Sequence, residues 1–133
     1  MIRCRSEIRV RYADTDQMRI VHHARFFEYF EIARSDLLRS IGMGYGEVEK
    51  KGYYLPVIEA QARYVSPAYY DELVIVETVI RNRPSVKMKI EYEAKRSDTL
   101  LATGYTIHGF IDEKTGRPVR LPDFFDEMVR GYY

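Results

Sequence analysis

The sequence has one cysteine, no tryptophan and almost no excess of charge of either sign. Because Cys4 is alone, an internal disulfide and a cysteine metal cluster are excluded, and the chain suits a reducing compartment. No segment approaches the roughly 20 apolar residues that span a bilayer, and the first residues lack the apolar stretch of a signal peptide. We therefore expect a cytoplasmic protein without membrane insertion.

The balance of charge also limits the partners. The 21 Lys and Arg residues nearly cancel the 20 Asp and Glu residues, so a surface for binding polyanions is not favoured and we expect no nucleic-acid partner. A chain of 133 residues with 46% hydrophobic residues is large enough for one core, and we interpret residues 1–133 as a single domain. Its 12 tyrosines suit partly wet surfaces or subunit contacts.

The first third of the chain shows two hydrophobic periods. From Ile2 to Tyr12 mostly apolar residues alternate with charged ones, which predicts a half-buried strand. After Val21 the apolar residues recur every three or four positions, which predicts one long amphipathic helix that stops near Gly42 and Gly44. The apolar positions of this helix are Phe26, Phe30, Ala33, Leu37 and Ile41.

The rest of the chain predicts four more strands, at 55–65, 73–80, 86–95 and 100–111, and a short helix after Leu121-Pro122-Asp123. The connections are short enough for an antiparallel meander after the long helix. The predicted fold class is α+β, a five-stranded antiparallel sheet wrapped around one long helix with a short C-terminal helix. This is the hotdog arrangement, although other α+β sheets with one covering helix fit the same order.

An acidic loop, Asp14-Thr15-Asp16-Gln17, stands directly before the long helix. The backbone N–H groups of a first helical turn are unpaired and carry partial positive charge, so they can hold a carbonyl oxygen that becomes an oxyanion. A nearby carboxylate could attack that carbonyl or activate water. The alternative is that the loop is only a turn stabilised by its own hydrogen bonds, which is the more common use of such residues.

The segment from Tyr12 to Phe27 resembles the signature of the 4-hydroxybenzoyl-CoA thioesterase family: an aromatic residue, one residue, Asp, any residue, Asp, a short loop, Val, an aromatic residue or His, then His or Tyr. It is most similar to the bacterial short-chain acyl-CoA thioesterase branch associated with the Tol-Pal envelope system. The resemblance continues through Tyr64 to Leu73, where the family has an aromatic residue, a proline and an acidic pair. It implies hydrolysis of an acyl-CoA thioester to a free acid and CoA, without a metal or other cofactor.

The resemblance implies catalytic roles for two residues. Asp16 matches the catalytic aspartate, as nucleophile or general base, and His23 matches the residue whose backbone N–H meets the thioester carbonyl. Asp14 then looks structural, and either His22 or His23 alternatively caps the helix. The loop departs from the family where Met18-Arg19 replaces small residues, which puts the acyl-group preference in doubt.

Substrate-binding residues are implied at two further places. The turn into the fourth strand matches the position of CoA-phosphate contacts and holds Arg81, Arg83, Ser85 and Lys87, although charged turns are usually just solvated. Glu31 matches a position that contacts the acyl group in aromatic-specific relatives, or is an ordinary exposed helix charge. His108, alone on the last strand, is interpreted as a packed or surface histidine.

Two other functions stay open, an acyl-CoA hydratase or dehydratase on the same fold and a non-catalytic module that binds acyl-CoA or an acyl carrier protein. The resemblance also implies a homodimer or homotetramer, because one sheet around one helix leaves edges exposed. The expected partners are therefore the acyl-CoA substrate and further copies of this chain, with an acyl carrier protein left open as a further partner.

Overall fold

The computed structural model describes residues 1–133. The alternating pattern at the start forms β1 (Ile2–Arg9), whose even-numbered residues are largely buried and whose odd-numbered residues are exposed. The prediction that this strand reaches Tyr12 is wrong, because the chain leaves the sheet and turns into a short 3-10 helix, η1 (Tyr12–Asp14).

The three-and-four pattern forms the predicted long helix, α1 (Arg25–Ser40). It buries one stripe against the sheet and leaves the charged stripe in solvent, as expected for an amphipathic helix. The chain ends this helix near Gly42, whose φ of +79° lies in the left-handed region that favours glycine. The buried stripe consists of Phe26, Tyr29, Phe30, Ala33, Arg34, Leu37 and Leu38.

The rest of the chain contains the four predicted strands and the predicted terminal helix, together with three short elements that the sequence patterns do not predict. The predicted elements are β3 (Val57–Tyr64), β4 (Leu73–Ile80), β5 (Lys87–Arg96), β6 (Thr99–Asp112) and α3 (Asp123–Arg130). The additional ones are α2 (Tyr45–Lys50), β2 (Tyr53–Tyr54) and β7 (Pro118–Val119). The two short strands extend the far end of β6.

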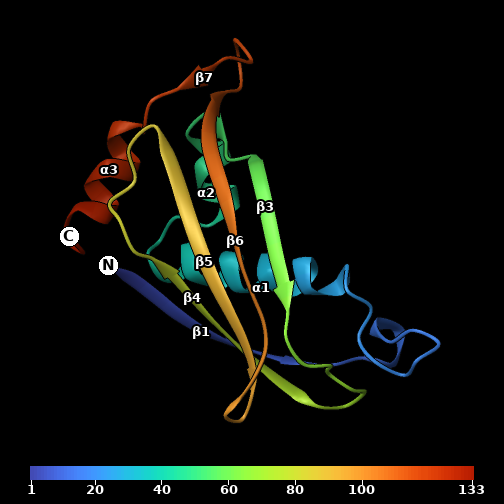
Figure 1. Cartoon of the computed structure of the whole chain (residues 1–133). Helices are drawn as coiled ribbons and strands as arrows, with labels where there is room; N and C mark the ends of the chain where they lie inside the picture. Colours follow the sequence, from blue (N-terminus) through green and yellow to red (C-terminus); the bar gives the residue numbers. More distant parts are fainter.

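The long strands form an antiparallel sheet in the order β1-β4-β5-β6-β3, curved around α1 (Figure 1). The predicted meander is therefore correct for β4, β5 and β6 and wrong for β3. Both sides of β4 are occupied, by β1 on one side and β5 on the other, so β3 pairs with the free side of β6. As a result β3 is an edge of the sheet, at the opposite side from β1.

The core lies between α1 and the inner face of the sheet. The rings of Phe30 and Tyr92 stack with 4.6 Å between their centroids and 12° between their planes. Phe30 fits there because Gly104 has no side chain: a Cβ at Gly104 would lie 2.7 Å from the Phe30 ring and 2.5 Å from the backbone oxygen of Gln61. Glycine at this position therefore permits the close approach of helix and sheet.

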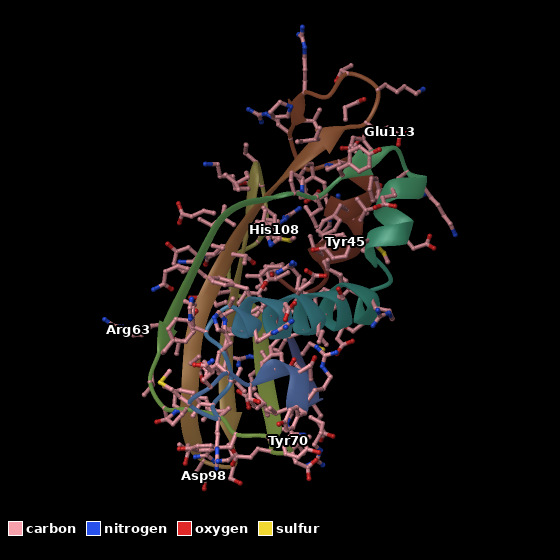
Figure 2. All side chains as sticks on the ribbon, turned by 90° about the vertical axis from the view of Figure 1, so that its right-hand side faces the viewer. Tyr45, Arg63, Tyr70, Asp98, His108 and Glu113 are labelled. Carbon is pink, nitrogen blue, oxygen red and sulfur yellow. The ribbon has the colours of Figure 1, made fainter.

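A buried polar array extends the core towards α2. Arg34 donates to the hydroxyls of Tyr45, at 2.6 Å, and Tyr92, at 3.2 Å, and has no carboxylate among its partners. Thr106 links Tyr92 to the Nε2 of His108, with distances of 2.6 and 2.8 Å. Figure 2 shows Tyr45 and His108 between α2 and the sheet. His108 is fully buried, so the interpretation as a packed histidine is confirmed.

We expect His108 to make the fold sensitive to mild acid. Burial, together with the nearby Arg34 charge, lowers the pKa of His108 from 6.5 to about 4. Between these two values the unfolded chain binds a proton that the folded chain excludes, so the free energy of unfolding should fall by on the order of 3 kcal/mol as the pH drops from about 6.5 to 4. Urea unfolding at several pH values measures this loss.

The control for this experiment is His108→Gln, which keeps a hydrogen-bonding side chain but does not titrate. Its unfolding free energy should change less steeply between pH 6.5 and 4.5 than that of the parental chain. Equal slopes for the two proteins would show that His108 does not carry the acid sensitivity.

Candidate active site

Asp14 is the buried anchor of the loop before α1. Its carboxylate accepts hydrogen bonds from the backbone N–H of Arg11 at 3.0 Å, from the Arg11 guanidinium at 2.9 and 3.2 Å, and from the Tyr29 hydroxyl at 2.8 Å. Burial favours a raised pKa, but the bonds from Arg11 and Tyr29 outweigh it and hold the pKa of Asp14 below its usual value. The backbone oxygen of Asp14 accepts the N–H of His22 at 2.9 Å, which ties the loop to the helix start.

Asp16 lies on the same loop but is partly exposed. One oxygen, Oδ1, accepts the backbone N–H of Met18 at 2.8 Å, and the other makes no hydrogen bond within the chain. The loop closes through the Asp16 N–H, which donates to the Ile20 oxygen at 2.9 Å. Arg19 adopts a φ of +65°, so this arginine occupies a left-handed position that favours glycine. The unusual Met18-Arg19 pair thus still makes the tight turn.

The start of α1 offers one free backbone donor. The N–H of Ala24, the residue before the first turn, donates to Nδ1 of His22 at 3.2 Å, while no side chain caps the first turn itself. The carbonyl oxygens of His22, His23 and Ala24 accept N–H groups of the first turn, at 2.9, 3.2 and 3.2 Å. The N–H of His23 has no partner, and it lies at the positive end of the helix dipole.

His23 itself is exposed and held by aromatic neighbours. Its ring stacks on that of His22 at 4.3 Å and meets the edge of Tyr64 at 6.1 Å. The Tyr64 hydroxyl donates to the backbone oxygen of His23 at 3.0 Å. Tyr64 belongs to the edge strand β3, so the sheet edge and the helix start meet here.

A surface hollow of about 460 Å³ brings the loop and the helix start together. Its lining includes Asp16 and the residues on both sides of His23, and it adds Arg25 and Glu28, which form an ion pair at 2.8 Å. The sequence patterns did not single out this ion pair. Its two residues are three positions apart on a predicted helix, a spacing that places oppositely charged side chains side by side. The complete lining is Ala13, Thr15, Asp16, His22, Ala24, Arg25 and Glu28.

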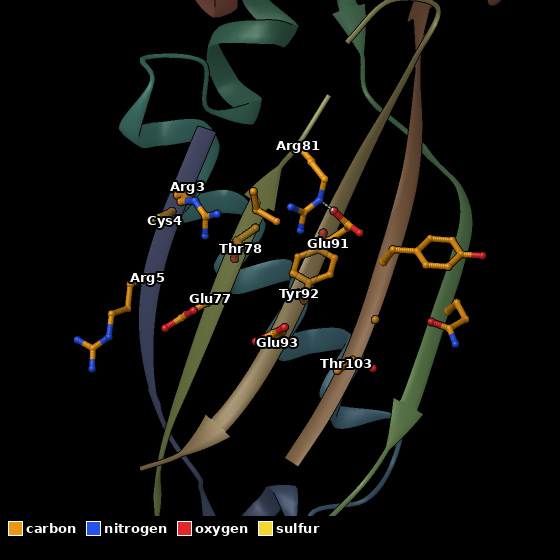
Figure 3. Close-up of a pocket in the computed structure, with 14 residues that line it drawn as sticks. Arg3, Cys4, Arg5, Glu77, Thr78, Arg81, Glu91, Tyr92, Glu93 and Thr103 are labelled. Atoms are coloured by element: carbon orange, nitrogen blue, oxygen red, sulfur yellow. Dashed lines mark hydrogen bonds and ion pairs between the residues drawn. The ribbon is translucent and has the colours of Figure 1, made fainter. Parts of the chain in front are cut away.

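The predicted CoA-binding residues do not share one pocket. Arg81 forms an ion pair with Glu91 at 3.0 Å on the outer face of the sheet (Figure 3). Both residues line a hollow of about 660 Å³. Arg83 bonds Asp126 of α3 at 2.7 Å, and it lines a different hollow of about 380 Å³ together with Ser85.

Within one chain these residues also lie far from Asp16. The loop with Asp16 is at the end of the sheet where β4 begins, whereas Arg83, Ser85 and Lys87 follow the other end of β4. An eight-residue strand is roughly 26 Å long. Glu31 is exposed on α1 and borders a hollow that does not include Asp16.

No group of three or more His, Cys, Asp or Glu side chains is arranged to hold a metal ion. None of the helices combines the length and the apolar character that crossing a bilayer requires.

An antiparallel sheet wrapped around one long helix, with an acidic loop at the helix N-terminus, is the hotdog fold, and the predicted fold class is confirmed. The chain belongs to the Thioesterase-like superfamily, whose sequence profile matches residues 10–129.

Three relatives illustrate the similarity. "Putative acyl-CoA thioesterase YneP" of Bacillus subtilis is 31% identical over 96% of this chain and 94% of its own length. The structure of hypothetical protein TT1821 from Thermus thermophilus is 34% identical with a TM-score of 0.90, and the match covers 97% of this chain and 98% of that one. DHNA-CoA thioesterase from Staphylococcus aureus is 32% identical with a TM-score of 0.90, over 99% of this chain and 89% of that one.

Proposed function

We propose that this protein hydrolyses an acyl-CoA thioester to a free acid and CoA at the hollow that contains Asp16. The observation that carries the proposal is the unpaired N–H of His23 at the start of α1, flanked by two residues of the hollow that Asp16 lines. A donor at the positive end of a helix stabilises the negative charge that develops on a carbonyl oxygen. The free oxygen of the Asp16 carboxylate supplies the base or nucleophile.

Two reaction routes use this arrangement. In one, the Asp16 carboxylate attacks the thioester carbon, the C–S bond breaks, CoA leaves as a thiolate, and water then hydrolyses the mixed anhydride. In the other, Asp16 takes a proton from water, the resulting hydroxide adds to the carbon, and that proton passes to the leaving sulfur. Both routes place negative charge on the carbonyl oxygen, where the His23 N–H acts.

The experiment that tests this function is an assay of free thiol on a panel of short-chain, long-chain and aromatic acyl-CoAs. Thiol release that depends on the protein is expected for at least one of them. Hydration of an enoyl-CoA without thiol release would contradict the proposal and indicate an acyl-CoA hydratase. Saturable acyl-CoA binding with neither reaction would also contradict it and indicate a non-catalytic binding module. The finer similarity, to 4-hydroxybenzoyl-CoA thioesterases and the Tol-Pal branch, remains a prediction that the acyl-group preference tests.

We also propose that the working form is a homodimer, or a homotetramer made of two such dimers, joined through β3. This strand pairs with β6 on one side only, and nearly all of its residues are exposed. Exposed apolar side chains along it include Val57, Ile58 and Tyr64. A long apolar edge strand is a template for pairing with another strand, and a second copy of β3 satisfies its backbone groups symmetrically.

Such pairing accounts for the distant CoA-phosphate residues. Two symmetric antiparallel strands run in opposite directions, so the Val57 end of one copy lies beside the Tyr64 end of the other. Lys87 is at the Val57 end of the sheet, two strands in from the edge. Three strand spacings, roughly 14 Å, then separate the partner's Lys87 from Tyr64. We infer that one subunit supplies Asp16 and the other supplies the phosphate contacts.

Among the predicted phosphate-binding cations, we expect Lys87 to contribute most. Arg81 and Arg83 are already engaged by carboxylates, whereas Lys87 has no ion-pair partner. Lys87→Ala should raise the KM for a full acyl-CoA by roughly tenfold, because a charge-assisted contact to phosphate is lost. The KM for the matching pantetheine thioester, which lacks the nucleotide phosphates, should stay the same.

The matched control is Lys50→Ala, which removes an exposed charge at the end of α2 and should change neither KM. An equal rise in KM for both substrates with Lys87→Ala would remove Lys87 from the phosphate site. The same comparison tests Arg83 and Ser85.

The predicted cytoplasmic location rests on the lone, unpaired Cys4.

A further inference from the structure

The geometry points to Tyr64 as a positioning residue for the thioester-binding amide, an inference that rests on the proposed function. Tyr64 is 41 residues from His23 in the sequence, yet its hydroxyl donates to the His23 backbone oxygen at 3.0 Å. That oxygen belongs to the same residue as the unpaired N–H. A hydroxyl that fixes one end of a residue restricts its two backbone dihedrals and thereby the direction of its N–H.

The remaining contacts of this residue explain why the tyrosine is needed. The oxygen of His23 is bonded within the chain only by the Phe26 N–H, at a long 3.2 Å, and by Tyr64. The His23 side chain is exposed, touching His22 and Tyr64 but making no hydrogen bond. His23 precedes α1 and therefore lacks the regular hydrogen bonds that hold a helical residue.

The ring of Tyr64 is itself fixed. It packs edge-on against His23 at 6.1 Å and against the buried Phe26 at 5.7 Å. Its backbone lies in the ladder opposite Ala102 of β6, one of the central strands. Partial burial raises the pKa of the Tyr64 hydroxyl, so it stays a donor. The hydroxyl is therefore delivered to His23 from a rigid sheet, not from a mobile loop.

The position of Tyr64 also connects assembly with catalysis. It is the last residue of β3, the strand through which we propose that a second subunit pairs. Pairing gives this strand a second hydrogen-bonded neighbour, and a change in the position of the strand would reach the His23 amide through the Tyr64 hydroxyl. Tyr64 thus does not contact the reacting atoms. It orients the His23 N–H, which we propose does.

The test uses Tyr64→Phe, which keeps the ring and removes only the hydroxyl. We expect kcat to fall roughly three- to tenfold, as for loss of one neutral hydrogen bond, and KM to stay within about twofold. The matched control is Tyr105→Phe, which removes a hydroxyl bonded at 2.7 Å to Glu59 across the same pair of strands, away from the hollow. This control should leave kcat unchanged.

Two readouts separate positioning from a general loss of structure. The chain has three histidines, so labelling with ¹⁵N-histidine gives three backbone amide signals. In Tyr64→Phe the His23 signal should shift and the buried His108 signal should not. In an Asp16→Asn background, in which we expect turnover to be slow enough to observe the bound substrate, the C=O stretching frequency of a bound thioester should move towards its value in water when Tyr64→Phe is added.

An unchanged carbonyl frequency and an unchanged kcat in a folded, assembled Tyr64→Phe protein would overturn the proposal. A fall in kcat accompanied by loss of assembly, with the carbonyl frequency unaffected, would overturn it as well, since Tyr64 would then act only through the strand. Absence of thioesterase activity in the parental chain would instead refute the proposed function, and the His23 amide signal would still report whether Tyr64 fixes that residue.

Discussion

Replacing Asp16 with asparagine is expected to lower kcat by roughly a hundredfold or more, the scale of losing a general base or nucleophile. The loop should survive, because an amide oxygen can still accept the Met18 N–H that now binds Oδ1. The residue is partly exposed, so the neutral side chain creates no buried defect. Steady-state thiol release, with oligomeric state and melting temperature measured on the same sample, gives the result.

Asp14→Asn provides the contrast at the other acid of the loop. Asp14 is buried and receives four hydrogen bonds from Arg11 and Tyr29, so the amide keeps part of that capacity but loses the charge. This variant should mainly lose thermal stability. His23→Ala should lie between the two in activity, because its backbone N–H remains. A folded, assembled Asp16→Asn protein that hydrolyses acyl-CoA near the parental rate would refute the catalytic assignment.

Local patterns predicted most of the elements that hold this site. The change of period after Val21 predicted α1 and its end shortly before Gly42, and the Asp-Thr-Asp loop predicted where a carboxylate lies beside a helix start. Such features depend on residues that are close in sequence, so a periodic reading detects them.

Features made by distant residues were not accessible in this way. β3 pairs with β6 and not with β4 because β1 and β5 occupy both sides of β4, an arrangement that no local pattern encodes. The bond between Tyr64 and His23 follows from that pairing. The turn with Arg83 has the right charges for phosphate, yet within one chain it lies at the opposite end of the sheet from Asp16. The role that we propose for this turn requires a second subunit, which a single sequence does not position.

A heterodimer of Asp16→Asn and Lys87→Ala subunits is expected to have a higher kcat/KM than either altered homodimer. If each site takes Asp16 from one subunit and Lys87 from the other, one site of the heterodimer carries both lesions and the other carries neither. The intact site should give about half of the parental kcat/KM, the share expected for one of two symmetric sites. Co-expression of the two chains with different tags, followed by two successive affinity steps, isolates this species.

The alternative arrangement, in which each site is built from a single chain, predicts a different result. Every site of the heterodimer then carries one substitution. Its kcat/KM should equal the mean of the two homodimers, roughly a twentieth of the parental value for a hundredfold and a tenfold defect. A heterodimer of Asp16→Asn with the control Lys50→Ala has one intact site under either arrangement and calibrates the value of one half. Recovery to that calibrated value requires a shared site, because neither altered chain contains both groups. A heterodimer that stays at the mean of its parents would show that each subunit hydrolyses its substrate with its own residues.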